Sequence, residues 1–212
     1  MSAPRFNTFL AAAGGDRDKA LKLYEWNAAM SAAVLHDLAH LEVGIRNAYD
    51  SALVARQPSA AHWTQDAVRY FPVRINVARD GTSVDSNEAP RKQLLTAINQ
   101  AGGAGAPTGK VVAELMFGFW RYLTISARET DLWLPYLRFG FVRGTARRHI
   151  DSPMKRLHTL RNRVAHHEPL LIIDLNGRRN DLLGVLSRIS PDLRTHVEAQ
   201  STWSSVQAQR PK

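Results

Sequence analysis

The amino-acid sequence predicts an all-α protein, a bundle of helices with short connections and with short irregular or hairpin insertions. Two observations lead to this class. Apolar residues recur at three- and four-residue steps through several long stretches, which is the period of an amphipathic helix. The longest of these stretches, from Lys19 to Ala55, contains no proline and a single glycine, Gly44.

The composition is that of a globular chain. Its 212 residues are 44% hydrophobic and 22% charged, which excludes bulk disorder and suffices to bury a core without disulfides. We expect one domain over residues 1–200 and a flexible tail over 201–212. The chain has no cysteine, so a disulfide scaffold, a thiol nucleophile and cysteine-ligated zinc or iron–sulfur sites are excluded.

The first strong helix follows Asp16, whose carboxylate can cap it. The apolar pattern then continues to Ala55, as one helix or as two helices nearly in line. Between residues 57 and 90 the pattern weakens. Alternating Val and Ile around an Asp80-Gly81 turn fit a short hairpin there, and a long irregular loop fits as well.

The second half of the chain is also helical in pattern. Thr108 can cap a helix that runs to Ile125, and the helical spacing of its aromatic residues predicts core packing rather than a base-stacking platform. Ser152 and Pro153 are expected to open a helix that ends before Pro169, because the residue before a proline is pushed out of the helical region. Other expectations are helices at 92–100, 179–190 and 191–200, helix-compatible sequence at 129–141, and a short strand or turn at 170–177.

The charge of the chain favours a polyanionic partner. Lys and Arg number 28 against 19 Asp and Glu, and the resulting net charge of +9 points first to nucleic acid. The densest basic stretch is opposed only by Asp151, and we expect it to contact an RNA backbone; the alternative is a solvated basic face. The residues assigned to RNA contact are Arg143, Arg147, Arg148, Lys155, Arg156 and Arg163.

No membrane segment, cofactor or metal is expected. The most apolar stretch, residues 111–125, is interrupted by Glu114 and Arg121 and is too short to span a bilayer; with no secretory signal visible, we expect a cytoplasmic protein. The segment GAGAPTGKV is not a phosphate-binding loop, because Ala104 replaces its first glycine and Val111 its Ser or Thr. ATP or GTP binding at this loop is discarded, and the metal motif HExxH is absent.

The segment RNRVAHHEP carries the most chemistry. Arg161 offers a forked, permanent charge to a phosphate in its transition state. His166 and His167 titrate near neutrality and can move protons in either direction, while Asn162 can orient a ring or hold a non-bridging oxygen. Because Pro169 ends the helix just beyond, we expect the last turn to loosen and let both histidines face one site. The alternative is a solvated face that caps the helix end.

Three blocks of sequence together resemble a known family. They are LYEWNAAMSAAVLHDLAHLEVGIRNAYD, VVAELMFGFWRYL and LHTLRNRVAHHEPL, and their order and spacing match. The third block contains the R-x(4–6)-H signature of HEPN domains, with the Asn that commonly follows the Arg. Over most of residues 20–170, the chain is similar to the Abi-like proteins of bacterial abortive-infection systems.

The resemblance implies a HEPN-like bundle that forms a homodimer in the bacterial cytoplasm, with a cleft shared by the two subunits. HEPN nucleases cut RNA without metal, use the 2′-hydroxyl as nucleophile and leave a cyclic phosphate. Carried over, Arg161 stabilises the phosphorane, and Asn162 positions substrate or ring. His166 or His167 is the general acid or base, and the sequence does not separate the two. The implied role is phage defence or toxicity, with tRNA or other single-stranded RNA as target and an unidentified antitoxin or activator.

The resemblance is incomplete at one position. A toxin branch of HEPN proteins has a Tyr two positions after the His, where this chain has Glu168, so we do not expect the antitoxin pairing of that branch. Glu42, Arg46 and Asn47 are expected to face the Arg161 helix; the alternative is a surface ion pair between Glu42 and Arg46. The alternative function is a non-catalytic RNA- or partner-binding HEPN module.

Overall fold

A computed structural model describes residues 3–57, 61–77 and 80–212. The predicted all-α class is confirmed, since the described residues form helices together with two short strands. The chain divides into two compact units. The first unit combines Met1–Gly44 with Ser152–Lys212, and the second is Ile45–Asp151.

Helix α2 (Arg17–Arg56) is one continuous helix of 40 residues, which decides between the one-helix and two-helix expectations. Asp16 caps it as predicted, because its Oδ1 accepts hydrogen bonds from the amides of Asp18 (2.9 Å) and Lys19 (3.0 Å). Gly44 allows a close approach in the first unit. A Cβ at that position would lie 2.8 Å from Cδ2 of Leu193, so any larger residue would displace that leucine.

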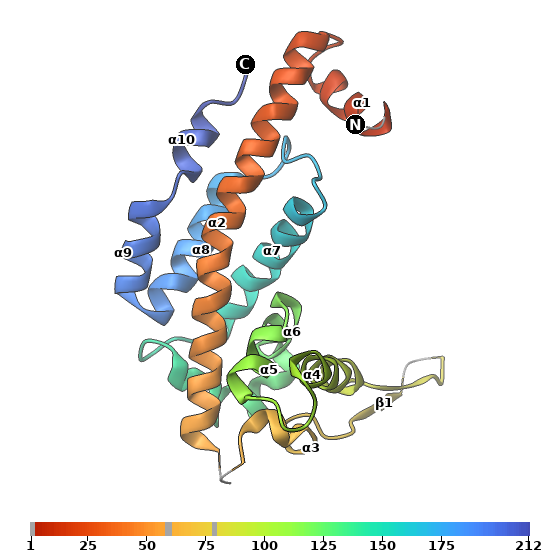
Figure 1. The fold of residues 1–212 in the computed structure, drawn as a ribbon, viewed down its shortest axis with the longest axis vertical. Helices are drawn as coiled ribbons and strands as arrows, with labels where there is room; N and C mark the ends of the chain where they lie inside the picture. The colour runs from red at the N-terminus through yellow and green to blue at the C-terminus, as the bar shows by residue number, and fades with distance from the viewer. Residues whose placement is uncertain (1–2, 58–60, 78–79) are drawn as a thin grey trace. The chain divides into compact units, whose positions relative to one another are not determined.

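In the first unit, the N-terminal part of α2 is flanked by C-terminal helices (Figure 1). Side-chain contacts hold them there: the Asp37 carboxylate on α2 accepts a 2.6 Å hydrogen bond from Ser201, and the His40 ring lies 5.7 Å from that of His196. The other helices of this unit are α1 (Ala3–Ala12), α8 (Leu175–Ile189), α9 (Pro191–Gln200) and α10 (Trp203–Ala208); α7 (Arg148–Ala165) contributes its residues from Ser152 onward.

The second unit has an aromatic core. Trp63 stacks on Phe119 with ring centroids 6.1 Å apart, and Trp120 meets Tyr49 at 6.2 Å. All four rings are fully buried, which confirms that the aromatic residues of this region form core. The helices of this unit are α3 (Ala67–Tyr70), α4 (Glu88–Ala101), α5 (Thr108–Glu114) and α6 (Phe117–Tyr122), with short helical turns at Trp63–Gln65, Ser126–Arg128, Glu129–Trp133 and Leu137–Gly140.

The hairpin alternative for residues 57–90 is confirmed. Strand β1 (Ile75–Val77) pairs antiparallel with β2 (Ser83–Asp85), in a register that sets Asn76 opposite Val84. The predicted Asp80-Gly81 turn is present: Asp80 Oδ1 accepts a 3.0 Å hydrogen bond from the amide of Thr82, and Gly81 has a φ of 81°.

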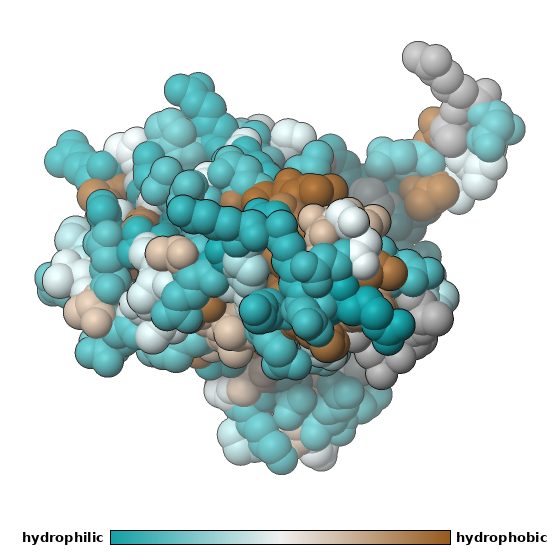
Figure 2. All heavy atoms as spheres, turned by 90° about the horizontal axis from the view of Figure 1, so that it is seen from above, coloured by the Kyte–Doolittle hydropathy of each residue, from teal (hydrophilic) through white to brown (hydrophobic). Residues whose placement is uncertain are grey.

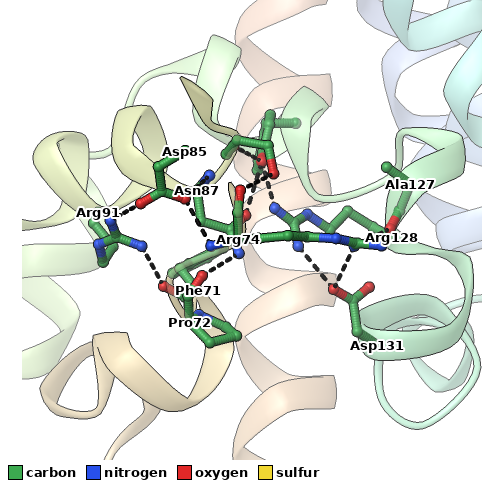
Figure 3. Close-up of polar contacts among 11 residues, drawn as sticks. Phe71, Pro72, Arg74, Asp85, Asn87, Arg91, Ala127, Arg128 and Asp131 are labelled. Carbon is green, nitrogen blue, oxygen red and sulfur yellow. Dashed lines mark hydrogen bonds and ion pairs between the residues drawn. The ribbon is translucent and has the colours of Figure 1, made fainter. Parts of the chain in front are cut away.

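A polar cluster anchors this hairpin to the second unit (Figure 3). The Asp85 carboxylate accepts hydrogen bonds from the amide of Arg74 (2.9 Å), from the Arg91 guanidinium and from the amide of Asn87 (3.0 Å). These donors stabilise the charged form and lower the pKa of Asp85 to about 2. The Asn87 side chain in turn donates to the carbonyl of Pro72 at 2.6 Å. The cluster therefore has a structural role, since it ties the hairpin to the start of α4.

The single helix expected from Thr108 to Ile125 is wrong. The chain is extended at Leu115 and Met116, which separates α5 from α6. The buried Trp120 indole donates a 3.0 Å hydrogen bond to the Leu115 carbonyl, an acceptor that an unbroken helix would use. Thr108 is the first helical residue, and Pro107 holds the cap position.

The expected start of α7 at Ser152 and Pro153 is also wrong, because the helix begins at Arg148 and contains Pro153. The first turn is held by Arg147, whose carbonyl accepts from the amides of Ile150 and Asp151, both at 2.9 Å. Its guanidinium also binds the Asp151 carboxylate at 2.9 Å. The carbonyl bonds are those found at the start of any helix, so the ion pair between Arg147 and Asp151 is the side-chain contact specific to this turn.

Residues 201–212, expected to form a flexible tail, instead dock on the first unit. Trp203 in α10 is fully buried, and the Trp26 indole on α2 donates a 2.9 Å hydrogen bond to the carbonyl of Val206. The Arg210 guanidinium lies 5.3 Å from the Trp26 ring.

Three further elements differ from expectation: α1 was not predicted, and α4 and α8 begin earlier than residues 92 and 179.

Hydrophilic side chains predominate on the face shown in Figure 2, and hydrophobic ones form small patches between them. Among the described helices, none is long and apolar enough to cross a membrane.

Candidate functional site at the end of helix α7

The end of α7 is a closed turn. The amide of His167 donates to the carbonyl of Val164 (3.1 Å), and the amide of Glu168 donates to that of Arg163 (2.9 Å). His167 has a φ of 54°, in the left-handed region. This pair of bonds around a left-handed residue is the Schellman motif. The expectation that the last turn loosens is therefore wrong, because its backbone donors are paired.

Histidine is an unusual choice for the left-handed position. Helices α1 and α4 end in the same way, and each uses glycine there, Gly14 with a φ of 63° and Gly102 with a φ of 121°. A side chain at positive φ costs on the order of 1 kcal/mol relative to glycine. Backbone strain of this kind, which a glycine at the same position would remove, is often found at functional sites.

Asn27 holds this turn from α2. Its Oδ1 accepts a 2.7 Å hydrogen bond from the amide of Leu170, and its Nδ2 lies 3.5 Å from the carbonyl of Glu168. The side chain is buried, with only 4% of the residue exposed. Sequence reasoning did not assign Asn27 a role, although it belongs to the W-N pair of the first block; an amide on a buried helix face was the available signal.

Two arginines add further contacts to the turn. Arg163 Nη1 donates to the carbonyl of Pro169 at 3.0 Å, and its Nη2 lies 3.4 Å from the Glu168 carboxylate. Arg5 on α1 donates to the carbonyl of His166 at 3.4 Å. The segment that bears the two histidines is thus held by Arg163 of α7 itself and by two helices that are distant in sequence, α1 and α2.

The four predicted catalytic residues lie within two turns of this end. Arg161 is half-buried, and its guanidinium has no hydrogen bond or ion pair with the rest of the described chain. Asn162 contacts His158 one turn earlier, with Nδ2 and Nε2 3.5 Å apart, and its carbonyl accepts from the amide of His166 at 3.0 Å. His166 and His167 are both exposed.

These positions define what the turn can do chemically. A free guanidinium can donate two parallel hydrogen bonds to a phosphate. The exposed imidazoles can exchange protons with a bound ligand. The arrangement therefore suits an anionic substrate whose reaction needs proton transfer.

Three of the six predicted RNA-contacting residues are engaged inside the protein. Arg147 binds the carboxylates of Glu129 and Asp151 and donates to the carbonyl of Thr124 at 2.7 Å. Burial lowers its pKa, but the two carboxylates outweigh this effect and raise it. Arg147 thus has three internal partners, and its assignment to RNA contact stays a prediction.

Arg156 and Arg163 are also committed to internal partners. Nε and Nη2 of Arg156 donate to the two oxygens of the Asp181 carboxylate, at 2.7 and 2.5 Å, and these bonds raise the pKa of Arg156. The remaining three predicted contacts are exposed, and within the ranges that the structure describes their side chains have no ion pair or hydrogen bond: Arg143, Arg148 and Lys155.

The positions predicted to face the Arg161 helix all lie on α2. Glu42 and Arg46 are half-buried and Asn47 is exposed. Within the described residues, no side-chain hydrogen bond or ion pair involves any of the three, so the ion-pair alternative for Glu42 and Arg46 is not formed. The structure contains no group of three or more His, Asp or Glu placed to hold a metal ion within its described part.

Comparison of the chain with protein-family models, with curated proteins and with solved structures finds no match in any of the three.

We expect His167→Gly to raise the free energy of unfolding by up to about 1 kcal/mol, because glycine adopts the left-handed conformation without the clash of a Cβ. Urea unfolding followed by circular dichroism measures the change. His166→Gly is the matched control, since His166 does not have a positive φ and gains nothing from the loss of its Cβ. A destabilised His167→Gly variant would mean that the imidazole itself supports the turn.

Proposed function

We propose that the chain is a metal-independent endoribonuclease of the HEPN, Abi-like kind, with its active site at the end of α7. Two observations carry the proposal: the left-handed φ of His167, and the half-buried Arg161 of α7, whose guanidinium has no partner among the described residues. A helix end with only a structural role would be served by glycine, as at Gly14 and Gly102. The resemblance of the three sequence blocks supports the same class.

In the proposed reaction, an imidazole removes the proton from the 2′-hydroxyl, whose oxygen attacks the adjacent phosphorus. A second, cationic imidazole protonates the departing 5′-oxygen. The products are a 2′,3′-cyclic phosphate and a 5′-hydroxyl. Arg161 stabilises the charge on the phosphorane oxygens, and Asn162 positions the substrate or a ring. His166 and His167 share the proton transfers, and single variants of each assign the two roles.

The proposal includes a homodimer and a role in phage defence or as a toxin in the bacterial cytoplasm. A shared cleft would bring two copies of Arg161 and of the histidines to one substrate, so cleavage would require two subunits. Single-stranded regions of tRNA or of other RNAs are the proposed target, because an in-line attack by the 2′-hydroxyl needs a flexible backbone.

The test is incubation of the purified protein with total tRNA and with an end-labelled single-stranded RNA in excess EDTA. We expect cleavage that leaves 2′,3′-cyclic phosphate ends, and light scattering of the same sample should give twice the 23.7 kDa chain mass. Cleavage that stops on addition of EDTA, or products with 3′-hydroxyl ends, would contradict the mechanism.

A non-catalytic RNA-binding module is the second candidate. It is favoured by the lack of any side-chain hydrogen bond or ion pair of His166 and His167 with other described residues, since a catalytic imidazole is often oriented by another group. This candidate needs only the exposed cations Arg143, Arg148 and Lys155. It predicts binding without products, with log K falling by about 2 per tenfold rise in salt, because each of three contacts contributes about 0.7 for a single strand.

A further inference from the structure

The second unit contains an open pocket that the proposed ribonuclease site does not use. It has a volume of about 710 Å³, which is within the range of small-molecule sites. Its walls come from the segment between residues 129 and 147, which includes the turns Glu129–Trp133 and Leu137–Gly140. All of its lining residues belong to the unit Ile45–Asp151, whereas the α7 end belongs to the first unit.

The pocket has an excess of cations. Arg138 and Arg143 line it and are exposed, and in the described part of the chain neither has a carboxylate partner. Glu129 is the one acidic lining residue, and it is already bound by Arg147. Two positive side chains are thus left without counter-charge at the mouth of the pocket. An anionic ligand would relieve their mutual repulsion.

One wall of the pocket is aromatic and apolar. Phe139 is 44% exposed, and the guanidinium groups of Arg56 and Arg138 lie 3.5 and 4.7 Å from the centre of its ring. Arg56 has no carboxylate partner among the described residues either. Leu134 is 42% exposed, and the buried Trp133 and Phe141 complete the wall. The Arg56 guanidinium already lies over one face of the Phe139 ring, so a planar ligand ring would contact the exposed part of Phe139 or stack on the guanidinium that covers it.

We infer that this pocket binds a nucleotide through its base and a terminal phosphate. A phosphate alone would satisfy Arg138 and Arg143 but would leave the apolar wall open to water. A neutral aromatic ring would cover the wall but would leave the cations unpaired. A nucleotide carries both features in one ligand, and forked guanidinium groups match phosphate oxygens. The same chemistry is present in a free nucleotide and at the 5′-phosphorylated end of an RNA, and the inference does not require that the protein cleaves RNA.

The test is isothermal titration calorimetry of the full chain with adenosine 5′-monophosphate, adenosine and inorganic phosphate. We expect the nucleotide to bind at least about tenfold more tightly than either fragment, since each lacks one half of the contacts. Arg138→Ala combined with Arg143→Ala should weaken nucleotide binding by about tenfold or more, and Phe139→Ala should weaken nucleotide and adenosine alike. Lys110→Ala, at an exposed lysine that does not line the pocket, should leave the affinity unchanged.

A second arm separates the two sources of the ligand. It compares a short RNA with a 5′-phosphate and one with a 5′-hydroxyl, both measured with the Arg161→Ala variant so that the RNA stays intact. Tighter binding of the phosphorylated RNA than of the free nucleotide, lost in the double variant, assigns the pocket to an RNA end. Tighter binding of the free nucleotide assigns it to a small ligand.

The inference is overturned by equal affinities for the nucleotide and inorganic phosphate, by no measurable nucleotide binding, or by Phe139→Ala and the double variant matching Lys110→Ala. Thermal unfolding of each variant verifies that the second unit is folded. Because the calorimetry does not depend on cleavage, failure of the ribonuclease proposal and failure of this inference give different results.

Discussion

Replacing Arg161 by alanine is expected to reduce the rate of RNA cleavage by about two to three orders of magnitude and to leave the fold intact. The loss follows from the removal of a cation that stabilises the phosphorane, a contribution of that size in enzymes with a preorganised charge. The fold should persist because the Arg161 guanidinium has no internal partner among the described residues, so its removal leaves no buried group unpaired. Single-turnover cleavage of a labelled RNA measures the rate.

The matched control for this prediction is Arg194→Ala on α9. Arg194 is exposed, and among the described residues its one carboxylate partner is Glu198 at 3.4 Å, so its replacement removes one positive charge and one exposed ion pair. A second comparison is Arg161→Lys, which keeps the positive charge but loses the two parallel N–H donors. Its cleavage rate should lie between those of the wild type and of Arg161→Ala. Cleavage by Arg161→Ala at the wild-type rate would place the active site elsewhere.

Replacing Trp203 by alanine is expected to lower the free energy of unfolding of the first unit by about 3–5 kcal/mol. Trp203 is fully buried, so truncation leaves a cavity the size of an indole in addition to the lost apolar contact. The change should also release Val206, whose carbonyl accepts the Trp26 hydrogen bond. Urea unfolding of the full chain, followed by far-ultraviolet circular dichroism, measures the difference.

Ser204→Ala is the control, since Ser204 is exposed in the same helix and should change stability by less than about 0.5 kcal/mol. A wild-type stability for Trp203→Ala would mean that α10 contributes nothing to the fold. Helix α2 links the C-terminal segment to the candidate site. Its Trp26 binds the backbone of Val206, and the neighbouring Asn27 binds the turn that bears His167. We therefore expect loss of α10 packing to disturb the candidate site as well as the fold.

Local pattern was enough to predict helical structure up to Ala55 and its start at Asp16, although not whether this stretch forms one helix or two. The period of apolar residues does not depend on which partner covers them, and the Asp16 cap is made with residues two and three positions away. The same local logic predicted the helix at 191–200, which is α9, and the turn at Asp80 and Gly81. The all-α class follows from such signals, since it is a sum of local preferences.

The breaks and starts that were missed have distant or unusual causes. Where the chain leaves the helix at Leu115, a buried indole binds the Leu115 carbonyl, and an ion pair between Arg147 and Asp151 lies at the start of α7. Neither signal belongs to the usual set of capping residues. The C-terminal segment was expected to be flexible because its sequence is polar around one tryptophan, yet Trp203 is buried and Trp26 binds the backbone of Val206 across 180 positions.

The sequence by itself determined that this protein is helical, basic and equipped with Arg161, Asn162, His166 and His167 in one short segment. Only the tertiary structure decided that the segment is a closed turn held by Asn27, and which arginines are free to meet a ligand. The physical reason is that a charge is neutralised by whatever carboxylate the fold brings to it. Asp181, which binds Arg156, is 25 positions away along the chain. The residue type at each position can be read from the sequence, whereas the fold decides which carboxylate binds which arginine.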